Sequence, residues 1–70
     1  MNRQPVISSN LRSVGYDSTT QVLEIEFHSG GIYQYINVPS NVHSSLLNAG
    51  SKGSYFQTFI KDRYATRKIR

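Results

Sequence analysis

Polar and apolar residues alternate in two neighbouring segments near the middle of the chain. In residues 21–27 every second side chain is apolar, and residues 32–38 repeat this pattern with β-branched and aromatic residues. A period of two in residues of this type predicts half-buried strands. The second strand is expected to end before Pro39, which lacks the N–H that a ladder requires. Residues 28–31 contain two adjacent glycines and predict the turn of a β-hairpin.

The register of this hairpin decides where Tyr33 and Tyr35 lie. Two residues apart on one strand, the two side chains share a face of the sheet. A three-residue loop (28–30) turns them toward the apolar side of the first strand, whereas a loop of two or four residues turns them toward solvent. Gly30 favours the three-residue loop and therefore burial. On an exposed face the pair could stack bases, and even a buried tyrosine hydroxyl can reach the rim.

Upstream of the hairpin, one or two shorter strands are expected within residues 6–8 and 11–16. A polar turn at 17–20 joins them to the hairpin. The prediction is an α+β domain with a small antiparallel meander sheet of three to four strands, followed by two helices packed on one face.

After the second hairpin strand the apolar period changes from strand-like to helical. Ser40 or Asn41 is expected to cap a first helix, and Gly50 to end it in the left-handed conformation. Ser51 is expected to cap a second helix, whose apolar residues lie on one side. From Ala65 onward the pattern fades, and no further element is predicted.

Seventy residues form a single domain, 1–70, with a core that rarely supplies more than about 3–5 kcal/mol net. Self-association would add stability, so a homo-oligomer is a possible state. The absence of cysteine excludes disulfides and thiolate zinc sites, and neither a metal nor another cofactor is expected. No apolar run long enough for a membrane span and no secretory signal is recognised, so a cytoplasmic protein without a membrane partner is expected.

The formal charge of +4 is concentrated at one end of the chain. Residues 61–70 form a basic, partly mobile C-terminal end with one acidic residue, whereas residues 1–60 are neutral. Such a field attracts phosphates over about 8–10 Å at ordinary salt, although a solvated tail has the same composition. The basic residues of this end are Lys61, Arg63, Arg67, Lys68 and Arg70.

The segment Ser51-Lys52-Gly53-Ser54 is a second candidate anion site. It lies at a predicted helix start, where free N–H groups and the helix dipole favour negative charge. Gly53 would let a ligand approach the backbone, while two hydroxyls and the Lys52 ammonium could contact it. The alternative is that the segment only caps the helix.

Catalytic chemistry has little support in this sequence. No nucleophile–histidine arrangement, phosphate-binding loop or dinucleotide fingerprint is present. Glu24 and Glu26 share one strand face, which is more typical of a solvent-facing side than of an acid–base pair. His28 and His43 are interpreted as surface residues. The protein is therefore expected not to be an enzyme.

Several strings of residues resemble the KTSC domain family. They are Ser9–Asp17, then Leu23-x-Ile25-x-Phe27-x-x-Gly30-x-x-Tyr33-x-Tyr35-x-x-Val38-Pro39, then Ser51-Lys52-Gly53-x-Tyr55-Phe56 and Ile60-Lys61. The family is named after the C-terminus of some lysyl-tRNA synthetases and includes stand-alone bacterial and phage proteins. The resemblance implies a role in nucleic-acid binding, with RNA as the expected ligand, and brings no established activity.

Charge and resemblance together predict a non-enzymatic RNA-binding module. The five basic residues of the C-terminal end would meet phosphates, with positioning contacts from Arg12 and the Lys52 turn. Tyr33, Tyr35 or Tyr55 would stack a base. Two alternatives stay open: a homo-oligomeric protein-interaction module that uses the aromatic surface, and a binder of a small anionic ligand, such as a nucleotide, at Ser51–Ser54.

Overall fold

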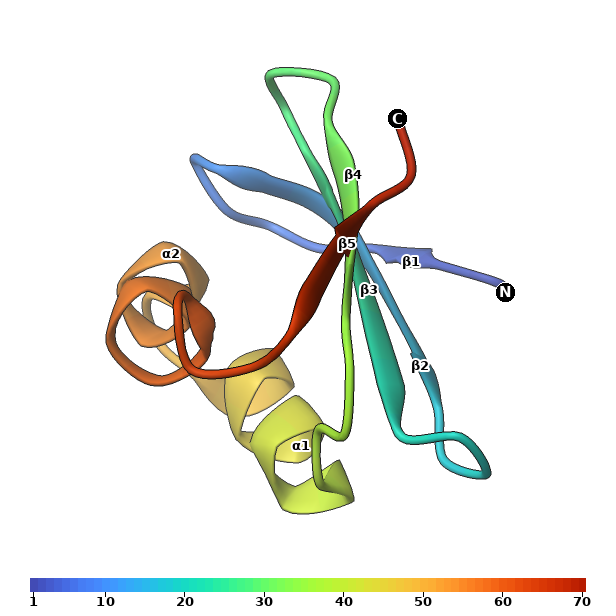
Figure 1. The fold of residues 1–70 in the computed structure, drawn as a ribbon. Helices are drawn as coiled ribbons and strands as arrows, with labels where there is room; N and C mark the ends of the chain where they lie inside the picture. Colours follow the sequence, from blue (N-terminus) through green and yellow to red (C-terminus); the bar gives the residue numbers. More distant parts are fainter.

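Five antiparallel strands lie side by side in the order in which they occur along the chain, in a computed structural model that describes residues 1–70. Helices cover one face of this sheet (Figure 1). The strands are β1 (Gln4–Pro5), β2 (Leu11–Asp17), β3 (Val22–Phe27), β4 (Ile32–Tyr35) and β5 (Thr66–Lys68). The predicted α+β architecture with a meander sheet and helices on one face is confirmed, with five strands in place of three or four.

The β3–β4 hairpin has the three-residue loop that favours burial of its tyrosines. Ile25 pairs with Tyr33 and Leu23 with Tyr35, so these four side chains share one face. Gly30 has a φ of 106°, and its amide donates a hydrogen bond to the Phe27 carbonyl at 2.9 Å. Because glycine has no Cβ, it takes this left-handed conformation without steric cost. The register with both tyrosines toward the helices is therefore the one that forms.

The C-terminal end contains a strand that the sequence analysis did not predict. Thr66 pairs with Tyr35 and Lys68 with Tyr33, and the Ile69 amide donates to the Ile32 carbonyl at 2.7 Å. All three residues of β5 are exposed, so the strand has no apolar alternation by which it could be recognised. It forms because β4 would otherwise leave a row of unpaired backbone groups. The expectation of an end without regular structure is corrected by this pairing.

The helical layer consists of α1 (Ser40–Asn48) and α2 (Lys52–Tyr55), which passes directly into a π-helical turn, η1 (Phe56–Ile60). The Lys61 amide donates to the Phe56 carbonyl at 2.8 Å, five residues back. Ser51 caps α2 as predicted, because its Oγ accepts a hydrogen bond from the Ser54 amide at 3.3 Å.

Both ends of α1 differ from the prediction. Pro39 occupies the capping position, so neither Ser40 nor Asn41 supplies a side-chain cap. The Pro39 carbonyl accepts the first hydrogen bond, from the Val42 amide at 3.0 Å, and the fixed φ of proline suits a residue that opens a helix. The helix ends at Ala49 in an extended conformation, and Gly50 is not left-handed.

The core lies between the sheet and the helices. A β-bulge between Leu11 and Ser13 shifts the register of β2 against β3, which brings Leu11 onto the same face as Val14. The nine buried residues of this core are Leu11, Val14, Leu23, Ile25, Tyr35, Val38, Leu46, Phe56 and Ile60.

The opposite face of the sheet carries a charged network in place of a second helical layer. Glu24 is only 6% exposed and is bound by the Arg3 guanidinium and by the Gln34 amide at 2.8 Å. The Arg3 Nε also donates to the Ser13 hydroxyl at 3.0 Å. Burial raises the pKa of Glu24, but the hydrogen bonds from Gln34 and Arg3 outweigh it, and the net pKa is lowered. The two glutamates of β3 are therefore structural: the Ser13 hydroxyl donates to Glu26 at 2.9 Å.

Candidate functional site

A cleft of about 340 Å³ opens at the β5 edge of the sheet, between β4 and the turn that follows η1. We call it the aromatic cleft. This volume is near the lower end of the range of about 300–1,000 Å³ that is typical of small-ligand sites. Its lining residues are Phe27, Tyr33, Tyr35, Phe56, Lys61, Asp62 and Thr66.

Four aromatic rings form one connected network in this cleft. Phe56 contacts Phe27 with ring centroids 5.2 Å apart and Tyr35 at 5.6 Å, and Phe27 contacts Tyr33 at 5.9 Å. All three pairs are edge-to-face, with interplanar angles of 67–72°. This geometry is favoured by the ring quadrupoles and holds each ring in one orientation. Because Tyr33 is only half-buried, the cleft offers a rigid aromatic surface to a planar ligand.

The Tyr35 hydroxyl is a polar group that the fold leaves unused. Tyr35 is 4% exposed, and its hydroxyl makes no hydrogen bond within the protein. No fully buried side-chain oxygen or nitrogen lacks a partner, so this hydroxyl must keep contact with solvent through the cleft. Burial, followed by the nearby Tyr33 and Asp62 charges, raises the pKa of Tyr35 to about 12. At neutral pH it is therefore a phenol that can donate a hydrogen bond.

Lys61 and Asp62 reach the aromatic cleft because the chain leaves the helix at this point. Lys61 is extended (φ −60°, ψ 128°), and Asp62 is left-handed with a φ of 62°. Both residues are exposed, and neither side chain takes part in a hydrogen bond or an ion pair. A free ammonium and a free carboxylate thus stand next to each other at the rim.

Strand β5 distributes the remaining basic residues around this site. Lys68 lies directly opposite Tyr33, so its side chain is on the cleft side of the sheet. Arg67 pairs with Gln34 and points to the other face. Arg63 and Arg70 are exposed on either side of the strand in sequence. Of the five basic residues, Lys61 lines the aromatic cleft, and Lys68 lies opposite Tyr33 on the same face of the sheet.

Two residues proposed from the sequence lie elsewhere. Tyr55 packs its ring against Phe59, with centroids 4.8 Å apart, on the helical surface. Arg12 is half-exposed on β2, where its Nε lies 3.9 Å from the Glu26 carboxylate. Neither of them lines the aromatic cleft.

The Ser51–Ser54 turn forms a helix cap. The groups of this turn that could contact an anion lie on two different surfaces of the fold. The Ser51 hydroxyl donates to the Ser54 hydroxyl at 3.0 Å as well as capping α2. A Cβ added at Gly53 would lie 2.9 Å from the Asn10 amide nitrogen, so this side chain fills the space that an anion would need. The polar depression of about 290 Å³ beside the turn is not lined by Lys52.

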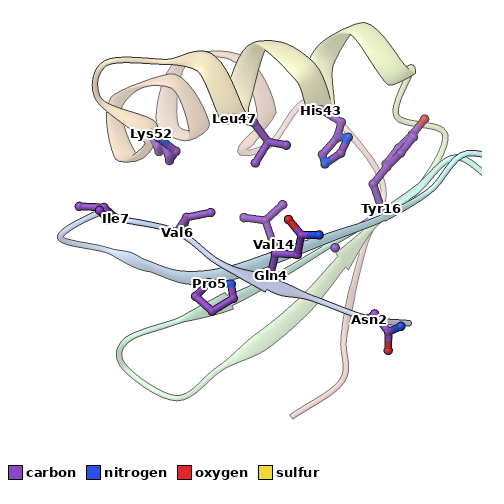
Figure 2. Close-up of a pocket in the computed structure, with 11 residues that line it drawn as sticks. Asn2, Gln4, Pro5, Val6, Ile7, Val14, Tyr16, His43, Leu47 and Lys52 are labelled. Atoms are coloured by element: carbon purple, nitrogen blue, oxygen red, sulfur yellow. The ribbon is translucent and has the colours of Figure 1, made fainter.

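Lys52 belongs to a second cleft of about 430 Å³, between β1 and α1 (Figure 2). Its Nζ donates to the Ala49 carbonyl at 3.4 Å. At the other end of this β1–α1 cleft the Tyr16 ring stacks on His43, with centroids 4.7 Å apart, and its hydroxyl donates to the Val38 carbonyl at 2.5 Å. Burial lowers the pKa of His43. The Tyr16 hydroxyl and the Lys52 ammonium of this cleft are thus both bound to backbone carbonyls of the protein itself.

Comparison with known proteins identifies the family. A model of the KTSC domain matches residues 7–64. The chain belongs to the KTSC domain family. The crystal structure of a KTSC domain protein from Yersinia pestis is 45% identical, with a TM-score of 0.96 over 99% of this chain and 97% of that one. The predicted resemblance is therefore confirmed, and this family is not a known catalytic one.

Relatives of this KTSC domain occur alone and within longer proteins. An uncharacterised protein of Stutzerimonas stutzeri is 45% identical over 64 residues, which cover 91% of this chain and 90% of that protein. A lysine–tRNA ligase of Trichormus variabilis is 48% identical over 56 residues, which cover 80% of this chain and 10% of the ligase. The chain thus spans about a tenth of the ligase that it matches.

Four cleft residues of this KTSC domain were not proposed from the sequence as site residues: Phe27, Phe56, Asp62 and Thr66. The two phenylalanines read as core residues, and Asp62 as one charge in a basic end. No local pattern joins them, because they come from β3, η1, a turn and β5.

Two further observations apply to the whole chain. No helix is long and apolar enough to cross a membrane, and no group of three or more histidine, cysteine, aspartate or glutamate side chains could hold a metal ion.

Proposed function

We propose that this KTSC domain is a non-enzymatic, cytoplasmic module that binds single-stranded RNA at the aromatic cleft and along β5. The observation that carries the proposal is the rigid aromatic surface at Tyr33 with two unpaired lysines, Lys61 and Lys68, beside it. The related segments in proteins named lysine–tRNA ligase support RNA as the class of nucleic acid.

An unpaired base would stack on the exposed part of the ring network. Base–aromatic stacking contributes about 1–3 kcal/mol per base and does not require a particular sequence. Bases within a double helix are already stacked on their neighbours, so an aromatic cleft favours loops and single strands. Stacking would therefore select single-stranded RNA.

The phosphates on either side of that base would meet the basic residues. Lys61 lies at the rim of the cleft and Lys68 on the neighbouring strand, so the backbone could follow the β5 edge. Arg67 and Arg70 would add to the attractive field without contacting the stacked base. Each phosphate contact on a single strand releases counterions and makes the slope of log K against log salt more negative by about 0.7.

Fluorescence anisotropy with a labelled single-stranded RNA at several salt concentrations tests the phosphate contacts. The double variant Lys61→Gln, Lys68→Gln should make the salt slope shallower by about 1.4, since two contacts are removed. Arg12→Gln, which removes a single charge, is the control and should leave the slope nearly unchanged, because Arg12 is half-exposed on β2 and lies outside the cleft. A salt-independent affinity, or equal losses in both variants, would contradict the proposal.

The stacking contact is tested in the same assay with Tyr33→Ala. Loss of one base–aromatic stack should weaken binding by about 5- to 150-fold. Phe59→Ala is the control, since Phe59 is an aromatic residue that is 53% exposed on η1 and does not line the cleft. Circular dichroism would establish that both variants are folded. Unchanged affinity in folded Tyr33→Ala would remove the aromatic cleft from the binding site.

A further inference from the structure

We infer that the aromatic cleft prefers guanine among the four RNA bases, with the Asp62 carboxylate accepting hydrogen bonds from N1–H and the N2 amino group of the base. The inference deepens the proposed function and rests on it, because it assumes that an unpaired base enters this cleft.

The presence of Asp62 needs a specific explanation. It is the one acidic residue among residues 61–70, and a carboxylate at this position repels the phosphates that the neighbouring lysines attract. No internal contact accounts for it, because Asp62 forms neither an ion pair nor a side-chain hydrogen bond. The residue adopts a left-handed conformation, which aspartate and asparagine tolerate better than other non-glycine residues, so the backbone accounts for the size of the side chain but not for its charge. A role in reading the base would account for a carboxylate at the rim.

The carboxylate and its neighbours match the hydrogen-bonding edge of guanine. An ionised carboxylate only accepts hydrogen bonds, and its two oxygens can accept a pair of parallel N–H groups. Guanine has two such adjacent donors, N1–H and the N2 amino group, with the O6 acceptor next to them. The Lys61 ammonium lines the same cleft and has three N–H donors, so it can donate to O6 while it also contacts a phosphate.

The Tyr35 hydroxyl strengthens this match from the inner side of the cleft. It has no partner within the protein and stays protonated at neutral pH, so it is a second available donor for O6. Asp62 and Tyr35 both line this cleft, and the Asp62 charge adds to the effect of burial in raising the pKa of Tyr35. One acceptor and two donors thus line a cleft with aromatic walls.

The other bases satisfy the same groups less well. Adenine and cytosine place a ring-nitrogen acceptor beside their single amino group, which sets a lone pair against one carboxylate oxygen. Uracil has a single N–H between two carbonyls and brings a carbonyl oxygen toward the carboxylate. Leaving a polar group of the site without its partner is the usual basis of such discrimination.

Base substitution within one short RNA is the direct test. Oligouridylates that carry a single guanosine, inosine, adenosine or cytidine would be compared by anisotropy at fixed salt. We expect the guanosine oligomer to bind most tightly, and the inosine oligomer about 10-fold more weakly because it lacks only the N2 amino group. Equal affinity of all the oligomers, with normal salt dependence, would overturn the base preference and leave the proposed RNA binding intact.

The variant Asp62→Asn assigns the preference to its residue. It keeps the shape of the side chain, replaces one acceptor by a donor, and should abolish the guanosine–inosine difference while binding of plain oligouridylate stays equal or rises. Asp17→Asn is the matched control, because it removes the same charge from the distant β2–β3 turn, where its Oδ1 accepts from the Thr19 amide. Retention of the preference in Asp62→Asn would overturn the assignment.

Guanosine monophosphate separates failure of the inference from failure of the proposed function. In a nuclear magnetic resonance titration, it should shift the amide signals of residues 33, 35 and 61–62 more than inosine monophosphate does. If it does so while the protein binds no RNA, base recognition stands and the RNA role is wrong. If neither nucleotide shifts these signals and no RNA binds, both are wrong.

Discussion

The two clefts at opposite edges of the sheet contain similar groups and use them differently. Each cleft has a tyrosine and a lysine next to apolar side chains, and each lies between the sheet and the helices. In the β1–α1 cleft, the Tyr16 hydroxyl and the Lys52 ammonium donate to backbone carbonyls. In the aromatic cleft, the Tyr35 hydroxyl and the Lys61 ammonium have no internal partner.

This difference indicates which surface is available to a ligand. A donor bound to a buried carbonyl stabilises the fold, and a ligand that displaced it would leave the carbonyl unsatisfied. A donor without an internal partner can bind a ligand without that cost. Residue composition alone would rank the two clefts alike, whereas their hydrogen bonds favour the aromatic cleft as the binding site.

The largest expected effect concerns the wall of the aromatic cleft. Phe56 is 6% exposed and contacts Phe27 and Tyr35, so Phe56→Ala should lower the free energy of unfolding by about 3–5 kcal/mol. Leu47→Ala, in the β1–α1 cleft, is the comparison, because Leu47 is already 38% exposed. It should cost less than about 1 kcal/mol. Urea denaturation monitored by circular dichroism gives both values, and equal losses would mean that the two walls contribute equally to the core.

Alkaline pH should destabilise the protein through Tyr35. The folded pKa of about 12 lies above the ordinary tyrosine value of 10.0, so the stabilisation is complete below pH 10 and is lost as the pH rises toward 12. Since one pKa unit corresponds to about 1.4 kcal/mol, the difference between 10.0 and about 12 corresponds to a loss on the order of 3 kcal/mol. Tyr35→Phe should make this part of the pH dependence disappear. The measurement is the difference in unfolding free energy between the wild-type protein and Tyr35→Phe at each pH. Parallel pH profiles of the two proteins would contradict the predicted role of Tyr35.

A smaller effect distinguishes the two tyrosine hydroxyls directly. Tyr16→Phe removes the donor to the Val38 carbonyl and should destabilise the protein by about 1–2 kcal/mol. Tyr35→Phe removes a hydroxyl without an internal partner and should change stability near neutral pH by less than about 0.5 kcal/mol. Thermal unfolding at pH 7 would compare them, and a larger loss in Tyr35→Phe would reverse the distinction between the clefts.

The smallest expected effect is the titration of His43 in the β1–α1 cleft. Burial lowers its pKa below the ordinary histidine value of 6.5, so the neutral form is favoured in the folded protein. The stabilisation is present above pH 6.5 and is lost as the pH falls through the lower folded pKa. A nuclear magnetic resonance titration of the imidazole signals should give a midpoint below 6.5 for His43. A midpoint above that value would show that a charged partner, and not burial, dominates at this site.

Sequence reasoning was most successful where the pattern was local. The alternation in residues 21–27 and 32–38 predicted the hairpin, and Gly30 indicated the loop that turns Tyr33 and Tyr35 toward the helices. The Ser51 cap was also predicted, since a cap depends on residues three positions apart. For the candidate site, the prediction named Tyr33, Tyr35 and Lys61 but missed the phenylalanines and Asp62 that complete the cleft.

The prediction failed where partners are distant along the chain. Strand β5 has three exposed residues and no alternation, and it forms only because the outer edge of β4 is free to pair. The turn at Ser51–Ser54 was proposed either as an anion site or as a plain helix cap; the cap is observed, and anion binding there stays a prediction. In the fold, Asn10 fills the space at Gly53, and Lys52 points to another cleft.

The amino-acid sequence by itself determined the period of each strand and helix, the hairpin loop, the position of the positive charge and the resemblance to the KTSC family. Only the tertiary structure decided that the charged end pairs with β4 and that Lys61, Asp62 and Tyr35 share a cleft. The physical reason is that local backbone preferences act over a few residues, whereas hydrogen-bond partners between edge strands, and the polar groups left without partners, depend on which distant segments the core brings together.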